Sequence, residues 1–181
     1  MAEWEKATEE MHNKINQLSR FRISFLHAEE FIKYIEGIGQ YARRFQEILL
    51  MGHFDNAFSE IMIEGYRHFS KGCKVRIISH GFNKRDEDDP NRRALESLAD
   101  LGIEVKVNVD AHARMLIGNH ENPYSAEVLL GSFDFNRDGM TRRKVNAGII
   151  TGHPDIVRDA VKLFDKVWEN KRSIPLHEYI K

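Results

Sequence analysis

Short apolar segments alternate with amphipathic, helix-like segments along most of this 181-residue chain. An apolar run such as residues 47–51 is typical of a buried strand, and strands alternating with helices form βα units. The sequence therefore predicts an α/β fold with a sheet flanked by helices. The expected strands are residues 21–26, 47–51, 73–79, 103–109, 114–117, 126–130 and 145–151, and the expected helices are residues 28–45, 57–69, 91–101 and 154–169.

The first residues have a different character. Apolar residues recur at helical spacing between residues 3 and 19, at Trp4, Ala7, Met11, Ile15 and Leu18. This amphipathic helix could dock on the domain as ordinary core, or could act as an interdomain linker or pair with a partner helix in a dimer. We expect residues 1–20 to form this linker or dimerisation helix and residues 21–181 to form one domain.

The charge and the cysteine content of the chain indicate its cellular compartment and its classes of partner. The chain has 27 Lys and Arg against 28 Asp and Glu, so no global field attracts it to nucleic acid or to an anionic membrane. Its single cysteine, Cys73, is expected to be a buried thiol in a reducing compartment. Without a long apolar run or a secretory signal, the chain is expected to be cytoplasmic, with no membrane partner.

Three segments carry the most informative motif. They are residues 110–119 (DAHARMLIGN), residues 130–136 (LGSFDFN) and residues 145–150 (VNAGII), followed by Phe164 and Trp168. Together they resemble the phospholipase D superfamily. Its signature is His-x-Lys with an Asp five residues after the Lys, then Gly-Ser-x-Asn, an Asn-x-Glu-like strand and a helix ending in Phe-x-x-x-Trp. The resemblance covers about residues 47 to 170 and implies a phospholipase-D-like mixed sheet.

The resemblance also implies a chemistry. In active members one histidine attacks phosphorus, a second protonates the leaving oxygen, and Lys and Asn hold the phosphoryl oxygens. A chain with one motif copy must homodimerise to bring two such histidines together. If this chain is active, His112 would therefore be the nucleophile, with Arg114 and Ser132 on the phosphate oxygens.

The motif departs from the active pattern at four positions. Arg114 replaces Lys, and Asn119 replaces the Asp, so His112 is expected to lose an anionic partner. Asp134 replaces the phosphate-binding Asn, and Gly148 stands where the family carries an acidic residue. A carboxylate about 4 Å from a phosphate charge is repelled by roughly 4 kcal/mol at an effective dielectric of about 20.

This repulsion would be relieved if Asp134 paired with Arg114 or Arg137, which would turn the old site into a closed, salt-bridged polar cluster. His53 and His80 follow strand ends, where ligand clefts of open α/β sheets form. If a pocket forms there, we expect it to bind a small polar or anionic ligand through residues from several parts of the chain. The expected ligand-binding residues are His53, His80, His112, Arg114, Asp134 and Asn136.

The sequence favours neither a cofactor nor a metal. Residues 134–139 begin like a calcium loop, but Val145 stands at the twelfth position, where that loop carries Glu. The histidines lack the spacing of a metal site, so His120 and His153 are expected to be structural or surface residues. The basic residues Arg142-Arg143-Lys144 form either a solvated loop or a contact for an anion or nucleic acid.

Three functional hypotheses remain open. The degenerate motif and the preceding helix resemble the C-terminal effector domains of TrmB-type archaeal transcription regulators, which implies a non-catalytic sensing and dimerisation domain. In that case DNA would be bound by a domain upstream of these residues or by the basic loop. The alternatives are a homodimeric phosphodiesterase or nuclease using His112, and a dimerisation scaffold without a ligand.

Overall fold

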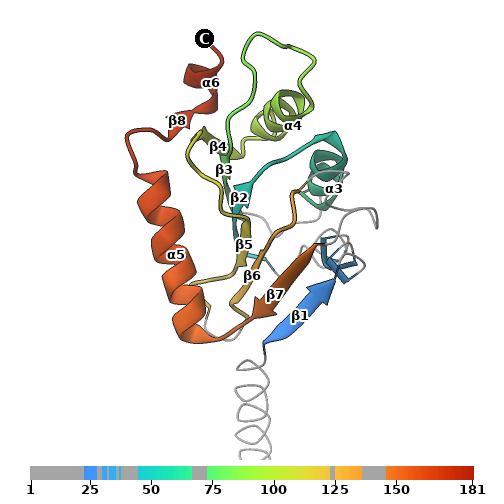
Figure 1. Cartoon of the computed structure of the whole chain (residues 1–181), viewed down its shortest axis with the longest axis vertical. Coiled ribbons are helices and arrows are strands. Elements are labelled where there is room, and N and C mark those ends of the chain that lie inside the picture. Colours follow the sequence, from blue (N-terminus) through green and yellow to red (C-terminus); the bar gives the residue numbers. More distant parts are fainter. Residues whose placement is uncertain are drawn as a thin grey trace, which may run out of the picture.

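The computed structural model describes residues 23–27, 30–31, 33–35, 37, 45–66, 73–122, 125–135 and 146–181. These residues form an eight-stranded sheet, with helices on both of its faces (Figure 1). The strands are β1 (Ser24–His27), β2 (Glu47–Gly52), β3 (Lys74–Ser79), β4 (Glu104–Val107), β5 (Met115–Gly118), β6 (Glu127–Gly131), β7 (Ala147–Thr151) and β8 (Ile174–Pro175). The helices with complete descriptions are α3 (Asn56–Tyr66), α4 (Pro90–Ala99), α5 (Pro154–Trp168) and α6 (Leu176–Tyr179). The expected α/β fold is confirmed.

The strand order is β1-β7-β6-β5-β2-β3-β4-β8. Strands β2, β3 and β4 are parallel and are connected through α3 and α4, whereas β5 pairs with β2 in the antiparallel direction. Because β5 is antiparallel to β2 and β6 is antiparallel to β5, the carboxyl ends of β2, β3 and β6 lie beside the beginning of β5, at one end of the strands. The mixed sheet therefore brings four separate chain segments to one place.

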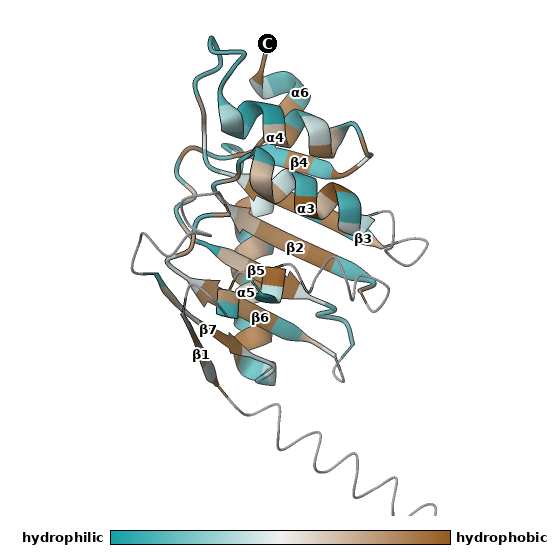
Figure 2. Cartoon of the chain, turned by 90° about the vertical axis from the view of Figure 1, so that its right-hand side faces the viewer, coloured by the Kyte–Doolittle hydropathy of each residue, from teal (hydrophilic) through white to brown (hydrophobic). Residues whose placement is uncertain are grey.

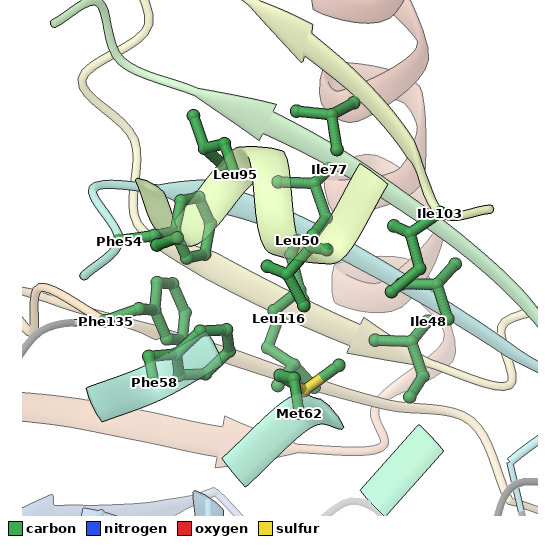
Figure 3. Close-up of a cluster of buried hydrophobic side chains, with 14 of the residues drawn as sticks. Ile48, Leu50, Phe54, Phe58, Met62, Ile77, Leu95, Ile103, Leu116 and Phe135 are labelled. Atoms are coloured by element: carbon green, nitrogen blue, oxygen red, sulfur yellow. The ribbon is translucent and has the colours of Figure 1, made fainter. Parts of the chain in front are cut away.

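Strand β2, near the centre of the sheet, is buried on both faces, as the apolar run over residues 47–51 predicts. Ile48 and Leu50 pack into a cluster with α3 and α4 (Figure 3), and Leu49 and Met51 pack into a second cluster with α5. Figure 1 shows α5 on one side of the sheet and α3 and α4 on the other. In Figure 2 the ribbon of β2 is brown over most of its length, the colour of hydrophobic residues. Helices therefore cover both faces of the central strands.

Most predicted elements agree with the structure to within a few residues. The predicted helix over residues 28–45 is wrong at its end, because Phe45 is buried but not helical, while described residues between 30 and 37 are helical. The predicted helix over residues 3–19 lies outside the described residues. Strand β8 and helix α6 were not predicted, since so short a pair has no readable periodicity and forms only by pairing on β4.

The polar segment over residues 81–89 is a mostly exposed connection that leads into α4. Asp89 accepts hydrogen bonds from the backbone N–H groups of Asn91 and Arg92 and so caps this helix. No helix in the described ranges is long and apolar enough to span a membrane.

Candidate functional site

A cavity of about 280 Å³ opens at the end of the sheet where the carboxyl ends of β2, β3 and β6 meet the beginning of β5. His53 follows β2, His80 follows β3, His112 and Arg114 precede β5, and Asp134 follows β6. The lining residues are Gly52, His53, His80, Ala111, His112, Ala113, Arg114 and Asp134. Five of the six residues expected to bind a ligand thus surround one cavity, and the sixth, Asn136, lies outside the described residues.

Asn91, at the beginning of α4, fixes the strand ends that carry two of these histidines. Its Oδ1 accepts hydrogen bonds from the Phe54 N–H, at 3.2 Å, and from the Ser79 hydroxyl, at 3.3 Å, and its Nδ2 donates to the His80 carbonyl at 3.2 Å. Only 2% of Asn91 is exposed. The sequence does not reveal this positioning residue, because a lone Asn after a helix-starting Pro gives no sign of which distant strands it contacts.

The expected ion pair between Asp134 and an arginine is present. The Arg114 Nε donates to Asp134 Oδ1 at 2.5 Å, and the Arg114 Nη1 donates to the His112 carbonyl at 3.2 Å. About a third of the Arg114 side chain and a quarter of the Asp134 side chain remain exposed, at 34% and 25%. The guanidinium that could hold a phosphoryl oxygen is therefore already bound by a carboxylate, although it still faces the cavity.

Two histidines contact each other in the cavity. The rings of His80 and His112 lie 4.5 Å apart between centroids, tilted by 43°. Burial lowers the pKa of His80, and the positive charges of His112, His53 and Arg114 lower it further, whereas a backbone hydrogen bond with Ala111 acts in the opposite direction. His80 is therefore held in its neutral form more strongly than an ordinary histidine.

Ser132 does not line the cavity. Its hydroxyl lies 3.3 Å from Asn146 Oδ1, and the Ala147 N–H donates to it at 3.2 Å, so Ser132 ties the end of β6 to the beginning of β7. The phosphate-binding role expected for Ser132, if the chain is active, has no support in this geometry.

The expectation that Asn119 deprives His112 of an anionic partner is wrong in geometry. His112 precedes β5 and Asn119 follows it, so the two residues lie at opposite ends of this strand. Asn119 is buried, adopts a positive φ of 52° and accepts a hydrogen bond from the Gln46 N–H at 2.7 Å. Asn119 therefore joins the beginning of β2 to the end of β5, and the sequence spacing alone could not reveal this.

The packing of a phenylalanine explains why no acidic residue stands at Gly148. A Cβ atom added there would lie 2.5 Å from the Phe133 ring and 2.8 Å from the Leu130 carbonyl oxygen. The Phe133 ring is buried and stacks on Phe31, with centroids 4.0 Å apart. The space next to β7 that a side chain would need is therefore occupied by the aromatic core.

His120 and His153 do not line the cavity. His120 Nδ1 lies 2.6 Å from Glu47 Oε2, and together with Glu121 these residues bring metal-ligand atoms within 4.8 Å of one another. The same carboxylate of Glu47 also pairs with Arg76, at 3.5 Å, so a positive charge already lies beside this group. His153 caps α5, since its Nδ1 accepts from the Asp155 N–H at 3.3 Å. The basic loop, Arg142-Arg143-Lys144, and most of the calcium-like segment lie outside the described residues.

Comparison with known proteins gives a consistent family assignment. Residues 48–168 match the model of the family described as cardiolipin synthase, phospholipase-D-like domain. No curated protein sequence matches the chain.

Several solved structures share the fold. Nuc from Salmonella typhimurium, a phospholipase D family member, is 14% identical with a TM-score of 0.65, and the match covers 85% of this chain and 97% of Nuc. NucT from Helicobacter pylori is 11% identical with a TM-score of 0.61, over 85% of this chain and 98% of NucT. TrmBL2, an archaeal chromatin protein, is 17% identical with a TM-score of 0.56, over 93% of this chain and 61% of TrmBL2. At identities this low, the structural matches show a shared fold and no more.

Proposed function

The chain belongs to the cardiolipin synthase, phospholipase-D-like domain family, and from this premise we propose that it is a non-catalytic sensing and dimerisation domain that binds a small anion. We infer further that it serves as the effector part of a transcription regulator. The ion pair between Arg114 and Asp134 carries the proposal. A site that hydrolyses phosphodiesters needs its cationic side chain on the substrate, and here a carboxylate competes for that cation and repels the substrate charge.

The cavity itself supports a ligand-binding role. Three histidines and an arginine line this opening. A domain that serves only as a scaffold has no need of such an opening, because apolar side chains packed at the usual density would fill the space. In a sensor, the ligand shifts the dimer between two geometries through its different affinity for each of them.

The regulatory part of the proposal draws on a different similarity. TrmBL2 is described as an archaeal chromatin protein with a novel mode of DNA binding, and its match extends over 93% of this chain. A homodimer would place two such domains in a regulator with two-fold symmetry. DNA would then be bound by a domain upstream of these residues or by the Arg142-Arg143-Lys144 loop.

One observation favours a second candidate function, a phosphodiesterase or nuclease. His112 lies against His80, with ring centroids 4.5 Å apart, and two neighbouring imidazoles could supply a nucleophile and a general acid. In the homodimeric form of this candidate, His112 of each subunit would face that of the other across the two-fold axis.

A paired assay separates the two candidates. We would measure hydrolysis of bis-p-nitrophenyl phosphate and of single-stranded DNA by the chain and by its His112→Ala variant, and thermal stabilisation of both by inorganic phosphate. The sensing function predicts no turnover by either protein and a phosphate-dependent rise in the melting temperature of the unmodified chain. Turnover that disappears with His112 would establish the enzyme instead. If the chain shows no turnover and phosphate does not stabilise it, the remaining hypothesis is a dimerisation scaffold without a ligand.

A further inference from the structure

Some of the charged side chains around the cavity are already paired within the protein, whereas others can still gain a proton. Arg114 and Asp134 carry opposite charges and bind each other, so their net contribution to the cavity is close to zero. In the part of the chain that the structure describes, the other titratable side chains that line the cavity are His53, His80 and His112. Among the described residues, an anion that enters would therefore be balanced largely by imidazoles, which can gain a proton when the ligand requires it.

His80 is the histidine with the clearest capacity to respond. Its Nδ1 atom is buried and has no hydrogen-bond partner in the described part of the chain, and its ring packs against His112. The backbone contact of the His80 side chain with Ala111, which favours the protonated ring, is outweighed by burial and by the cationic neighbours. Four groups face it: His53 from the end of β2, His112 and Arg114 from the beginning of β5, and Asp134 from the end of β6, which neutralises Arg114. Burial is the main cause of the lowered pKa of His80, and the cationic neighbours His112, His53 and Arg114 lower it further. An anion in the cavity is the group that would reverse both effects.

The size of the cavity limits the ligand. Its volume of about 280 Å³ is close to the lower end of the range of roughly 300–1,000 Å³ that holds drug-sized molecules. A phosphate group with a small substituent fits this space, whereas a lipid or a length of nucleic acid must lie mostly outside it.

We propose that His80, with His53 beside it, makes this cavity select a doubly charged phosphate group, of inorganic phosphate or of a phosphomonoester, over a singly charged phosphodiester, and that His80 takes up a proton when the anion binds. This inference rests on the proposed anion-sensing function and names its ligand class. Neither His53 nor His80 belongs to the motif that identifies the family.

The selectivity follows from the charge of the ligand. The attraction between an imidazolium ring and an anion grows in proportion to the ligand charge, so a dianion offsets the unfavourable neighbours of protonated His80 better than a monoanion does. A phosphomonoester has a second pKa of about 6, close to that of an imidazole, so the ligand and His80 exchange a proton readily near neutral pH.

Titration calorimetry tests the proposal directly. The chain, a His80→Asn variant and a control variant at an exposed histidine, His177→Asn, would each be titrated near neutral pH with inorganic phosphate, glycerol 3-phosphate, sulfate and dimethyl phosphate. Repeating each titration in two buffers with different ionisation enthalpies gives the number of protons taken up. Sulfate serves as a dianion that does not itself titrate near neutral pH.

The expected result has three parts. The chain and the His177→Asn variant bind the dianions about tenfold more tightly than dimethyl phosphate, and bind sulfate with uptake of roughly one proton. The His80→Asn variant loses about tenfold in affinity for the dianions together with the proton uptake. If glycerol 3-phosphate binds more tightly than inorganic phosphate, the ligand is a monoester, and the reverse order identifies free phosphate; either order supports the ligand class.

Two different results would overturn the inference, and they can be told apart. If the chain binds dimethyl phosphate as tightly as the dianions, or if the His80→Asn variant takes up as many protons as the chain, the selectivity is wrong while anion sensing stands. If none of the anions binds, the proposed function fails as well. A His80→Gln variant, checked for its folded state by circular dichroism, replaces His80→Asn if that variant does not fold.

Discussion

At the scale of single residues, the site is defined by which charges are already bound within the protein. Arg114 is tied to Asp134 before any ligand arrives, and His80 is kept neutral by burial and by cationic neighbours. Each arrangement weakens the attraction for a phosphodiester and leaves a cavity that an anion can still enter. Substituting either residue therefore changes anion binding or its dependence on pH.

Replacing Asp134 with Asn should strengthen anion binding. The substitution removes a negative charge that faces the cavity and frees the Arg114 guanidinium, so the affinity for inorganic phosphate should rise by about tenfold or more. Calorimetry measures this change, with Asp159→Asn on the exposed face of α5 as the control. An unchanged or weaker affinity would show that Asp134 does not restrain Arg114.

His80 should also make the stability of the protein depend on pH. Because the pKa of His80 is below its ordinary value of 6.5, the unfolded chain binds more protons than the folded one as the pH falls through 6.5, and folded stability declines. In His80→Asn this contribution is absent. The loss of melting temperature between about pH 7.5 and about pH 5.5 should therefore be smaller in the variant. Equal losses in both proteins would contradict the assignment, and His177→Asn serves as the control.

At the scale of elements, the pairing of β6 with β7 decides which side chains the site can hold. Gly131 of β6 faces Gly148 of β7, and both lie against the Phe133 ring. The ring stacks on Phe31, which places the aromatic core where a side chain from β7 would otherwise stand. The absence of an acidic residue at this position is therefore part of the packing of these two strands.

Restoring an acidic residue at Gly148 should destabilise the protein. The Cβ atom of Gly148→Glu would collide with Phe133 and with the backbone of β6, at a cost of about 3 kcal/mol in the free energy of unfolding. Chemical denaturation measures this cost, and Ala147→Glu at the exposed neighbouring position is the matched control. Equal stability of the two variants would mean that the strands can separate to admit the side chain.

At the scale of the whole molecule, the edge of the sheet formed by β1 is suited to self-association. Strand β1 pairs with β7, and at this edge Phe25 is 77% exposed and Ile23 is 47% exposed. Ile23 directly precedes β1, and side chains two residues apart along an extended segment point to the same side, so Ile23 and Phe25 form a small apolar surface at this edge. An exposed edge strand with such a surface is suited to pairing with a second copy.

A charge at this edge should weaken the proposed dimer. We expect Phe25→Asp to shift the chain from dimer toward monomer, because the substitution would bury an unpaired carboxylate between two copies. Light scattering after size-exclusion chromatography measures the mass over a concentration series. Leu163→Asp, at an exposed apolar position on α5, is the control. A mass that Phe25→Asp leaves unchanged would place the dimer contact elsewhere, with the amphipathic segment over residues 3–19 as the next candidate.

The sequence alone determined the elements and the family, because both are written in local patterns. The apolar run over residues 47–51, the alternating helices and the spacing from His112 to Trp168 depend on neighbours in the chain. The same reasoning placed His53 and His80 at strand ends, and the structure brings both to one cavity with His112 and Arg114.

The tertiary structure decided what each polar residue contacts, because those partners are distant in sequence and are selected by strand order and register. Arg114 contacts Asp134 across two paired strands, and Ser132 turns toward β7 instead of the cavity. Asn119 lies at the far end of β5 from His112, although both belong to one motif. Asn91 holds the ends of β2 and β3 from a helix whose sequence gives no sign of them. Local patterns fix where a strand runs, whereas the contacts at its ends depend on which strands the folded sheet places beside it.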